Sequence, residues 1–255
     1  MNITKSSNPV LKERVFSRDY TSSSDVMTVN GTMNKTAIML LLVVAAAVFT
    51  WNKFFDAVAS NPEAAMSAVA PWMVVGGIGG FITVLVTVFR PKSSGISAPV
   101  YAVFEGLLLG GLSAILEMQY QGIVMRAVAL TLAVFAAMLF LYRSGIIKVT
   151  NKFMMGVFAA TAGVALVYLV SFIAGMFGAE MSFLYGNSNL SIGFSLVVVA
   201  IAALNLILDF SFIERASDAG APKYMEWYGA FGLMVTLIWL YLEILRLLAK
   251  VASRD

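Results

Sequence analysis

The stretch LSIGFSLVVVAIAALNLILDFSFI, residues 190–213, is apolar along almost its whole length. Its only ionisable side chain is Asp209, and Asn205 precedes that aspartate by one helical turn. A helix of about 20 apolar residues crosses the hydrocarbon core of a bilayer. The stretch therefore predicts a transmembrane helix that carries a carboxyl group within the membrane.

Further apolar blocks of similar length indicate that the whole chain is a membrane protein. The 255 residues are 60% hydrophobic and 12% charged, and a soluble domain carries roughly twice that share of charge. We see no series of alternating segments about 10 residues long, which membrane β-barrels require. The sequence therefore predicts an all-α, polytopic bundle of seven transmembrane helices, at residues 36–55, 71–90, 98–118, 124–143, 153–178, 190–213 and 225–249.

The composition excludes several kinds of chemistry. The chain has no cysteine and no histidine, so it forms no disulfide and lacks the side chain that usually titrates near neutral pH. Proton sensing therefore falls to carboxyl groups. We find no serine–histidine pair and no HExxH or GxGD motif, so we expect neither an enzyme nor a resident cofactor. The net charge of +3 does not indicate a nucleic-acid partner.

The distribution of basic residues predicts the orientation, because short cytoplasmic segments are enriched in Lys and Arg. The polar tail at residues 1–35 and alternate loops hold most of the basic residues. We therefore expect a cytoplasmic tail and a transmembrane domain over residues 36–255, with the C-terminus on the opposite side. The basic residues near that end favour the alternative in which the last segment does not fully cross and both ends are cytoplasmic.

Small residues recur at four-residue spacing in the predicted spans. Such pairs let helix backbones approach closely in lipid. They predict tight helix packing, and the alternative is a path lined by exposed backbone. The pairs are Gly76 with Gly80, Gly106 with Gly110, and Ser171 with Gly175.

Acidic residues inside the predicted spans are the candidate functional groups, because a charge there is costly and usually faces the bundle interior. At about 1.5 Å per residue, Asp209, Glu105 and Glu226 lie within about 6–10 Å of the predicted cytoplasmic ends of their spans. We expect these three acids to share one layer, with Arg90 as the nearest basic residue. Glu243 lies toward the far face, where its spacing from Arg246 predicts a local ion pair.

Two carboxyl groups that meet in a medium of low dielectric do not both ionise cheaply and titrate as a pair. A proton shared by Asp209 and Glu226 forms a neutral, hydrogen-bonded latch, and its loss leaves oxygen ligands that suit Ca²⁺. The alternative for any one acid is a salt bridge to Arg90 or Lys223, or a hydrogen bond made while protonated. We expect the amide of Asn205 to support the latch or to bond a neighbouring helix.

The C-terminal third resembles the Bax inhibitor-like membrane proteins, and most closely their bacterial, YccA-like branch. The resemblance rests on ILDFSFIE followed by a short polar loop, on PKYMEWYGAFG and on TLIWLYLEILRLL, with further support from RVFSRDY and VYAVFEGLLLGGLS. It covers most of the chain and is most specific from residue 204 to residue 248. It implies a bundle of seven helices in which the last helix is central.

The resemblance also implies a pH-sensitive calcium leak governed by one acid on the sixth span and one on the seventh. Asp209 matches the first acid, and Arg90 matches an arginine that the family places near the end of the second span. Glu243 lies where the family has a leucine-rich segment, whereas Glu226 lies at the depth of Asp209. We therefore expect Glu226 to be the partner of Asp209, with Glu243 as the alternative.

We thus expect a passive, pH-sensitive cation leak in a bacterial inner membrane, with calcium as the transported ion and Asp209 and Glu226 as its ligands. The alternative is a non-conducting regulatory membrane protein that binds a membrane protease or another protein partner. The family supports both functions in different members. A secondary transporter has little support, because no inverted repeat is visible in the sequence.

Overall fold

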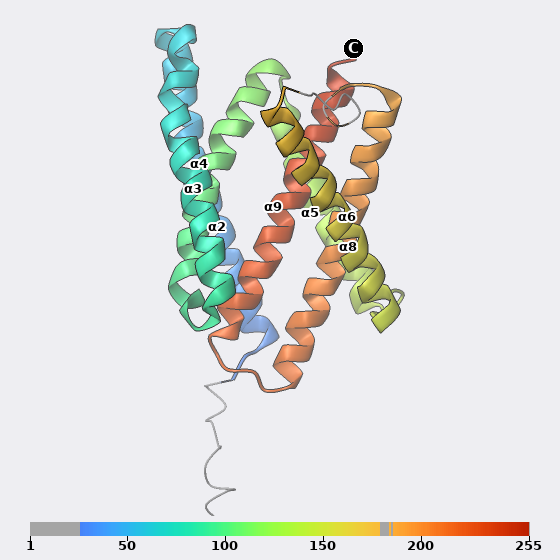
Figure 1. Cartoon of the computed structure of the whole chain (residues 1–255). Coiled ribbons are helices and arrows are strands. Elements are labelled where there is room, and N and C mark those ends of the chain that lie inside the picture. Colours follow the sequence, from blue (N-terminus) through green and yellow to red (C-terminus); the bar gives the residue numbers. More distant parts are fainter. Residues whose placement is uncertain (1–25, 179–183, 185, 255) are drawn as a thin grey trace, which may run out of the picture.

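The computed structural model of the chain describes residues 26–178, 184 and 186–254. These ranges contain seven helices that are long and apolar enough to cross a membrane (Figure 1). Two short 3₁₀ turns, Pro62–Ala64 and Pro91–Ser93, precede the second and third of them. The helices are α2 (Val29–Ser60), α3 (Ala65–Phe89), α4 (Ser94–Gln119), α5 (Ile123–Arg143), α6 (Asn151–Met176), α8 (Asn189–Asp218) and α9 (Met225–Ala252).

Each predicted span matches one of these helices to within a few residues at its apolar part, which confirms the all-α bundle. The largest difference is at α2, which begins at Val29 rather than at residue 36. The hydroxyl oxygen of Thr28 accepts the backbone N–H of Gly31 (3.0 Å) and caps the helix. Residues 29–35 are therefore helical and not part of the predicted tail. The tail up to residue 25 lies outside the described residues.

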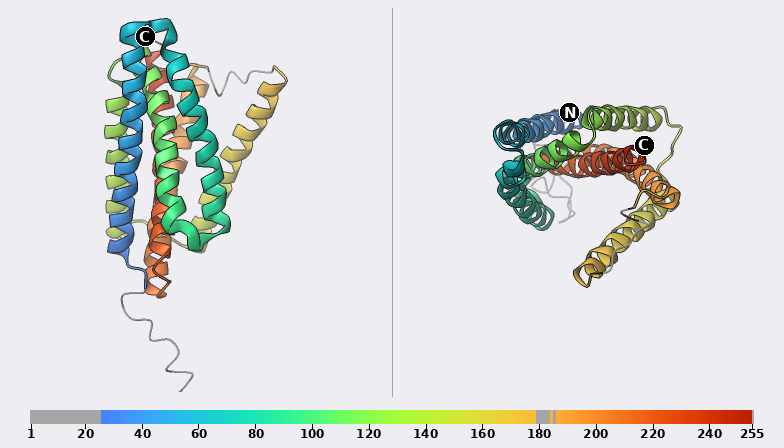
Figure 2. Two further views of the ribbon diagram at one scale, coloured as in Figure 1. Left: turned by 90° about the vertical axis from the view of Figure 1, so that its left-hand side faces the viewer. Right: turned by 90° about the horizontal axis from the view of Figure 1, so that it is seen from above.

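The last helix, α9, is central, as the resemblance implies. It packs against α2, α4, α5 and α8. On one side, α2, α3 and α4 form a closely packed group. On the other side, α6 packs against α8 and extends away from the rest of the bundle (Figure 2).

The glycine pairs of α3 and α4 lie at close helix crossings, as predicted. A Cβ at Gly106 would lie 2.4 Å from the carbonyl oxygen of Val43 on α2. One at Gly76 would lie 2.5 Å from the carbonyl oxygen of Phe104 on α4. Any larger residue would push these backbones apart. The prediction is wrong for Gly175 of α6, where an added Cβ would meet no described atom within 4 Å beyond its own turn of helix.

The start of α2 and the end of α9 lie at opposite ends of the bundle (Figure 1). Because α9 has 28 residues, it is about 42 Å long and sufficient to cross a bilayer. This length favours seven complete crossings over the alternative of a last segment that stops short. The end at which α2 begins, beside the α8–α9 turn, is called the predicted cytoplasmic end below.

Candidate functional site

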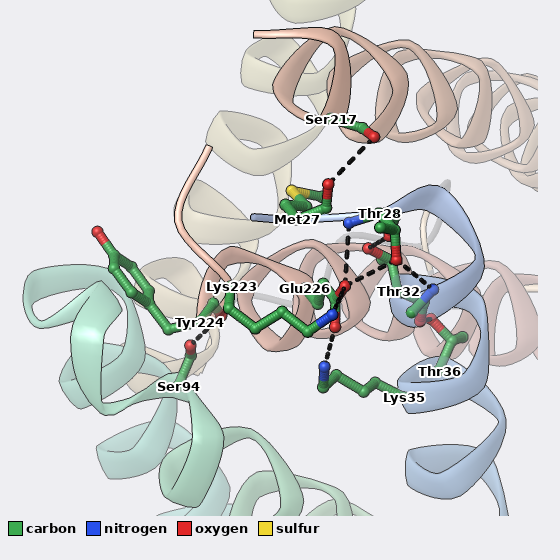
Figure 3. A network of polar contacts seen from close by, with 11 residues as sticks. Met27, Thr28, Thr32, Lys35, Thr36, Ser94, Ser217, Lys223, Tyr224 and Glu226 are labelled. Atoms are coloured by element: carbon green, nitrogen blue, oxygen red, sulfur yellow. Dashed lines mark hydrogen bonds and ion pairs between the residues drawn. The ribbon is translucent and has the colours of Figure 1, made fainter. Parts of the chain in front are cut away.

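A buried ion cluster lies at the predicted cytoplasmic end, around Glu226 in the first turn of α9 (Figure 3). The Glu226 side chain is fully buried. Its Oε1 accepts hydrogen bonds from the backbone N–H of Thr28 (2.9 Å) and from the hydroxyl of Thr28 (2.8 Å). Lys35 of α2 pairs with Oε2, and Lys223 lies 3.0 Å from Oε1. Both carboxylate oxygens of Glu226 are therefore engaged.

The same end of the bundle holds the segment that leads into α2. Met27 is 1% exposed, and its backbone N–H donates to the carbonyl of Ala221 (2.7 Å). Its own carbonyl accepts a hydrogen bond from the hydroxyl of Ser217 (3.3 Å). Val26 and Pro222 form an isolated antiparallel bridge. The start of α2 is thus tied to the turn between α8 and α9.

The charges around Glu226 correct the prediction that it shares a proton with Asp209 and binds calcium. Two lysines supply its counter-charge, and hydrogen bonds between charged partners are stronger than those between neutral ones. These bonds, together with those from Thr28, occupy the oxygens that a proton or Ca²⁺ would need. In this conformation Glu226 is a structural anion, and its partners are Lys35, Lys223 and Thr28.

Asp209 lies on α8, and its carboxyl group is only partly hydrogen-bonded. Its Oδ2 is buried and has no hydrogen-bond partner in the part of the chain that the structure describes. On α9, the hydroxyl of Thr236 donates to the carbonyl of Gly232 (3.3 Å), and it is also the hydrogen-bonding neighbour of the Asp209 carboxyl group. A hydroxyl of the seventh span therefore contacts Asp209 where the resemblance implies a second acid.

Asn205, one turn before Asp209, joins α8 to α6. Its Nδ2 donates to the hydroxyl oxygen of Thr161 on α6 (2.8 Å) and to the carbonyl of Ile201 (2.8 Å). The amide therefore bonds a neighbouring helix, which is one of the two roles that the sequence predicts for it.

Glu105 and Arg90 do not join Asp209 in a polar contact. Glu105 of α4 faces α3, where a Cβ at Gly80 would lie 2.9 Å from its Oε2. Arg90 follows the last residue of α3, is exposed and forms no ion pair with any acid in the described ranges. Depth along a span does not fix the direction in which a side chain leaves its helix. For this reason the acids predicted to share a layer have separate neighbours.

Glu243 belongs to a second polar cluster, toward the other end of α9. Arg246 forms the ion pair with Glu243 that their spacing predicts (3.0 Å). The hydroxyl of Tyr168 on α6 donates to the same carboxylate oxygen (2.9 Å) and accepts a hydrogen bond from Arg246 (2.6 Å). Glu243 is 2% exposed. It therefore anchors α6 to α9 and is not the partner of Asp209.

Sequence reasoning missed the residues that complete these clusters. Lys35 was assigned to the tail, although it lies directly before the first apolar block and so within reach of a helix start. Thr28 was not recognised as a helix cap. No local signal marks Thr236, because a threonine in an apolar helix usually bonds its own backbone.

Comparison with known proteins gives a match to a protein family. The model of a family described as Bax inhibitor 1 like matches residues 8–253. No curated protein and no solved structure matches the chain. Within the described ranges, no group of three or more His, Cys, Asp or Glu side chains is placed to hold a metal ion.

Proposed function

The chain belongs to the Bax inhibitor 1 like family, and from this premise we propose that it is a pH-sensitive passive cation leak with Asp209 as its titratable group. The family is a membrane-protein family not known for enzymatic activity. The observation that carries the proposal is the buried Oδ2 of Asp209, which has no hydrogen-bond partner within the described residues although it lies inside a helix long enough to span the membrane. Its proposed location is a bacterial inner membrane, with the N-terminus in the cytoplasm.

A buried carboxyl group with a free oxygen responds both to protons and to cations. The protonated form is neutral and can remain in an apolar bundle, whereas the charged form requires a compensating cation. Carboxylate and hydroxyl oxygens are ligands that suit Ca²⁺, and Asp209 and Thr236 supply one of each. Loss of the proton from Asp209 would therefore create a binding position for a passing calcium ion.

The Glu226 cluster supports the description of this conformation as closed at the predicted cytoplasmic end. Met27 and Thr28 lie across the start of α9 and are held there by the hydrogen bonds and ion pairs described above. An ion that leaves Asp209 at this end has to pass these contacts. The proposed gate is thus separate from the proposed titratable group.

The test is calcium flux into liposomes that contain the purified protein and an enclosed calcium dye, measured across a range of pH. We expect the wild-type protein to show a leak that depends on pH, and Asp209→Asn to abolish that dependence because an amide does not titrate. The matched control is Asp218→Asn, at the exposed end of the same helix. Absence of a leak at every pH, or an unchanged pH profile in Asp209→Asn, contradicts the proposal.

A non-conducting regulator remains the second candidate, and the position of α6 favours it. Only Val157, Val164 and Ser171 of this helix are buried, and α8 is its one closely packed neighbour among the described helices. A helix so placed has free faces for another membrane protein, such as a membrane protease. A photo-crosslinking residue at position 172, where Phe172 is 67% exposed, tests this. Crosslinking to a protease subunit together with absence of flux supports the regulator.

A further inference from the structure

Glu105 of α4 is an intramembrane acid that the proposed leak does not use. Ser94, at the start of α4, donates a hydrogen bond to the carbonyl of Tyr224 beside the start of α9 (3.0 Å), so the two helices begin at the same level. At 1.5 Å per residue, Glu105 lies about 16 Å along α4 from that level. The hydrocarbon core of a bilayer is about 30 Å thick. Glu105 is therefore close to the middle of the membrane.

The carboxyl group of Glu105 forms neither a hydrogen bond nor an ion pair with any residue that the structure describes. It packs against α3 at Gly80, where a Cβ would lie 2.9 Å from its Oε2. The missing side chain of Gly80 thus provides the space that the carboxyl group occupies. On the same helix, Tyr101 is the titratable group that faces Glu105, from one turn away.

The helices that pack against α4 bring no counter-charge to Glu105. α3 has no ionisable side chain, and α2 has none between Lys35 and Lys53. The charged residues of the other two helices lie near helix ends or in the clusters described above: Arg126 and Arg143 of α5, and Glu226, Glu243, Arg246 and Lys250 of α9. A carboxylate without a counter-charge is costly inside a membrane, whereas the neutral acid is tolerated. Glu105 is therefore placed to hold a proton.

A row of hydroxyl groups leads from the predicted cytoplasmic end to Glu105, along the contact between α3 and α4 (Figure 2). Ser97 of α4 is buried, and its hydroxyl accepts a hydrogen bond from Thr87 of α3 (2.7 Å). The Thr87 hydroxyl also lies 2.8 Å from the carbonyl oxygen of Thr83. The Thr83 hydroxyl donates to the carbonyl of Gly80 (2.9 Å), the residue against which Glu105 packs.

Toward the other end of the bundle the same contact is apolar. α3 has no polar side chain between Trp72 and Thr83. The next hydroxyl of α4 is that of Ser113, which bonds Tyr241 of α9 (2.7 Å). Threonines in helices often bond their own backbone and serve packing alone, but here the row places polar groups on one side of Glu105 only. A proton therefore has a polar route to Glu105 from the cytoplasmic end and none along this contact from the opposite end.

We propose that Glu105 is a second proton-binding site, separate from Asp209, which exchanges its proton with the cytoplasmic side along the hydroxyls of Ser97, Thr87 and Thr83. The ligand is the proton, and the carboxyl group holds it in the neutral form. The inference does not rest on the proposed leak, and its tests do not use ion flux. Failure of one therefore leaves the other intact.

A hydrophobic carbodiimide tests the site, because such a reagent reacts with protonated carboxyl groups in membranes and not with carboxylates. The protein in sealed vesicles is treated with dicyclohexylcarbodiimide, and modified residues are located by mass spectrometry of its peptides. We expect an adduct at Glu105 at neutral pH and none at Glu226, which is also buried but is paired with two lysines. Absence of an adduct at Glu105 at every pH, or equal modification of both acids, overturns the proposal.

The same reagent tests the side from which the proton arrives. Right-side-out and inside-out vesicles are prepared with the inner and outer pH set independently. Modification of Glu105 should be lost when the pH on the cytoplasmic side is raised, and should persist when only the pH on the opposite side is raised. Because the reagent crosses the membrane, its own access is equal in both arrangements. Modification that follows the pH of the opposite side contradicts the assigned route.

A second measurement detects the proton without a reagent. The infrared absorption of protonated carboxyl groups is recorded for the purified protein across a range of pH. Glu105→Gln should lose the C=O signal of one protonated carboxyl group. Glu117→Gln on the same helix is the matched control and should keep it, because the Glu117 carboxylate accepts hydrogen bonds from the backbone N–H groups of Gly122 (2.6 Å) and Val124 (3.0 Å). A spectrum of Glu105→Gln equal to that of the wild type contradicts the proposal.

Discussion

Lys35 of α2 and Glu226 of α9 form a buried ion pair although they are 191 positions apart in the chain. Lys35 also lies over the ring of Trp227, at 5.5 Å from its centroid. The pair therefore joins the first and last transmembrane helices at the predicted cytoplasmic end, beside the turn that links α8 to α9. Together with the hydrogen bonds of Thr28 to Glu226, it holds the start of α2 against the start of α9.

Glu226→Gln should destabilise the protein. The substitution removes the carboxylate but leaves Lys35 and Lys223 with no counter-charge, and an unpaired charge in a partly buried site is costly. The expected loss is up to about 3 kcal/mol, because Lys223 remains 48% exposed and is screened by solvent. The measurement is the thermal unfolding midpoint in detergent.

The control for this substitution is Glu63→Gln, which changes an exposed acid at the other end of the bundle. Lys35→Gln combined with Glu226→Gln should recover part of the stability lost in Glu226→Gln alone, because the double variant removes both members of the pair. An unfolding midpoint for Glu226→Gln equal to that of the control would show that the ion pair does not hold this end together.

The helices were predictable because the thickness of the bilayer fixes the length of each apolar block, whatever its neighbours are. The pair of Glu243 and Arg246 was predictable for a similar reason, since residues three apart share a helix face. The partners of Glu226 and Asp209 were not. They depend on how two helices far apart in sequence are rotated against each other, and no periodicity in an apolar helix fixes that rotation.

Asp209 illustrates how the rotation of the helices, which the sequence does not fix, decides the contacts of the candidate site. Its height in the membrane followed from counting residues, but its contact with the hydroxyl of Thr236 did not. Nor did the count reveal that Lys35 extends to Glu226 and neutralises it. The proposed function rests on the acid that the sequence singles out, whereas the partner expected for it, Glu226, pairs with two lysines instead.

Thr236→Val should move the pH dependence of the proposed leak. The Thr236 hydroxyl is the hydrogen-bonding neighbour of the Asp209 carboxyl group on α9, and a methyl group in its place can bond neither form of that carboxyl group. The midpoint of the pH profile should therefore shift. The measurement is calcium flux into liposomes as a function of pH.

Thr131→Val is the matched control, because the Thr131 hydroxyl donates to the carbonyl of Ala127 (2.7 Å) and does not contact Asp209. It should leave the midpoint unchanged. An unchanged midpoint in Thr236→Val, or the same shift in both variants, would show that the hydroxyl of Thr236 does not act on the titrating group.

Gly110→Ala should destabilise the contact between α2 and α4. The added Cβ would lie 2.1 Å from the hydroxyl oxygen of Thr50 and 2.2 Å from the carbonyl oxygen of Ala47. Because one of these atoms is backbone, α2 has to move, and overpacking of this kind costs about 1–3 kcal/mol. The thermal midpoint in detergent should fall.

Gly163→Ala on α6 is the control for that substitution, since an added Cβ there meets no atom of the described residues within 4 Å beyond its own turn of helix. Alanine also has a higher helix propensity than glycine, by about 1 kcal/mol. Its midpoint should stay the same or rise. Equal destabilisation by both variants would mean that the close crossing of α2 and α4 does not decide the outcome.

Cysteine labelling can fix the orientation, because the chain has no cysteine of its own. Asp218→Cys places a thiol at the exposed end of α8, Gln121→Cys places one in the turn between α4 and α5, and Ser253→Cys places one at the end of α9. A maleimide that does not cross membranes should label Gln121→Cys and Ser253→Cys in intact cells. It should label Asp218→Cys only after the membrane is opened, because basic loops remain in the cytoplasm. If Ser253→Cys is labelled only after the membrane is opened, as Asp218→Cys is, the last helix does not cross the membrane despite its length.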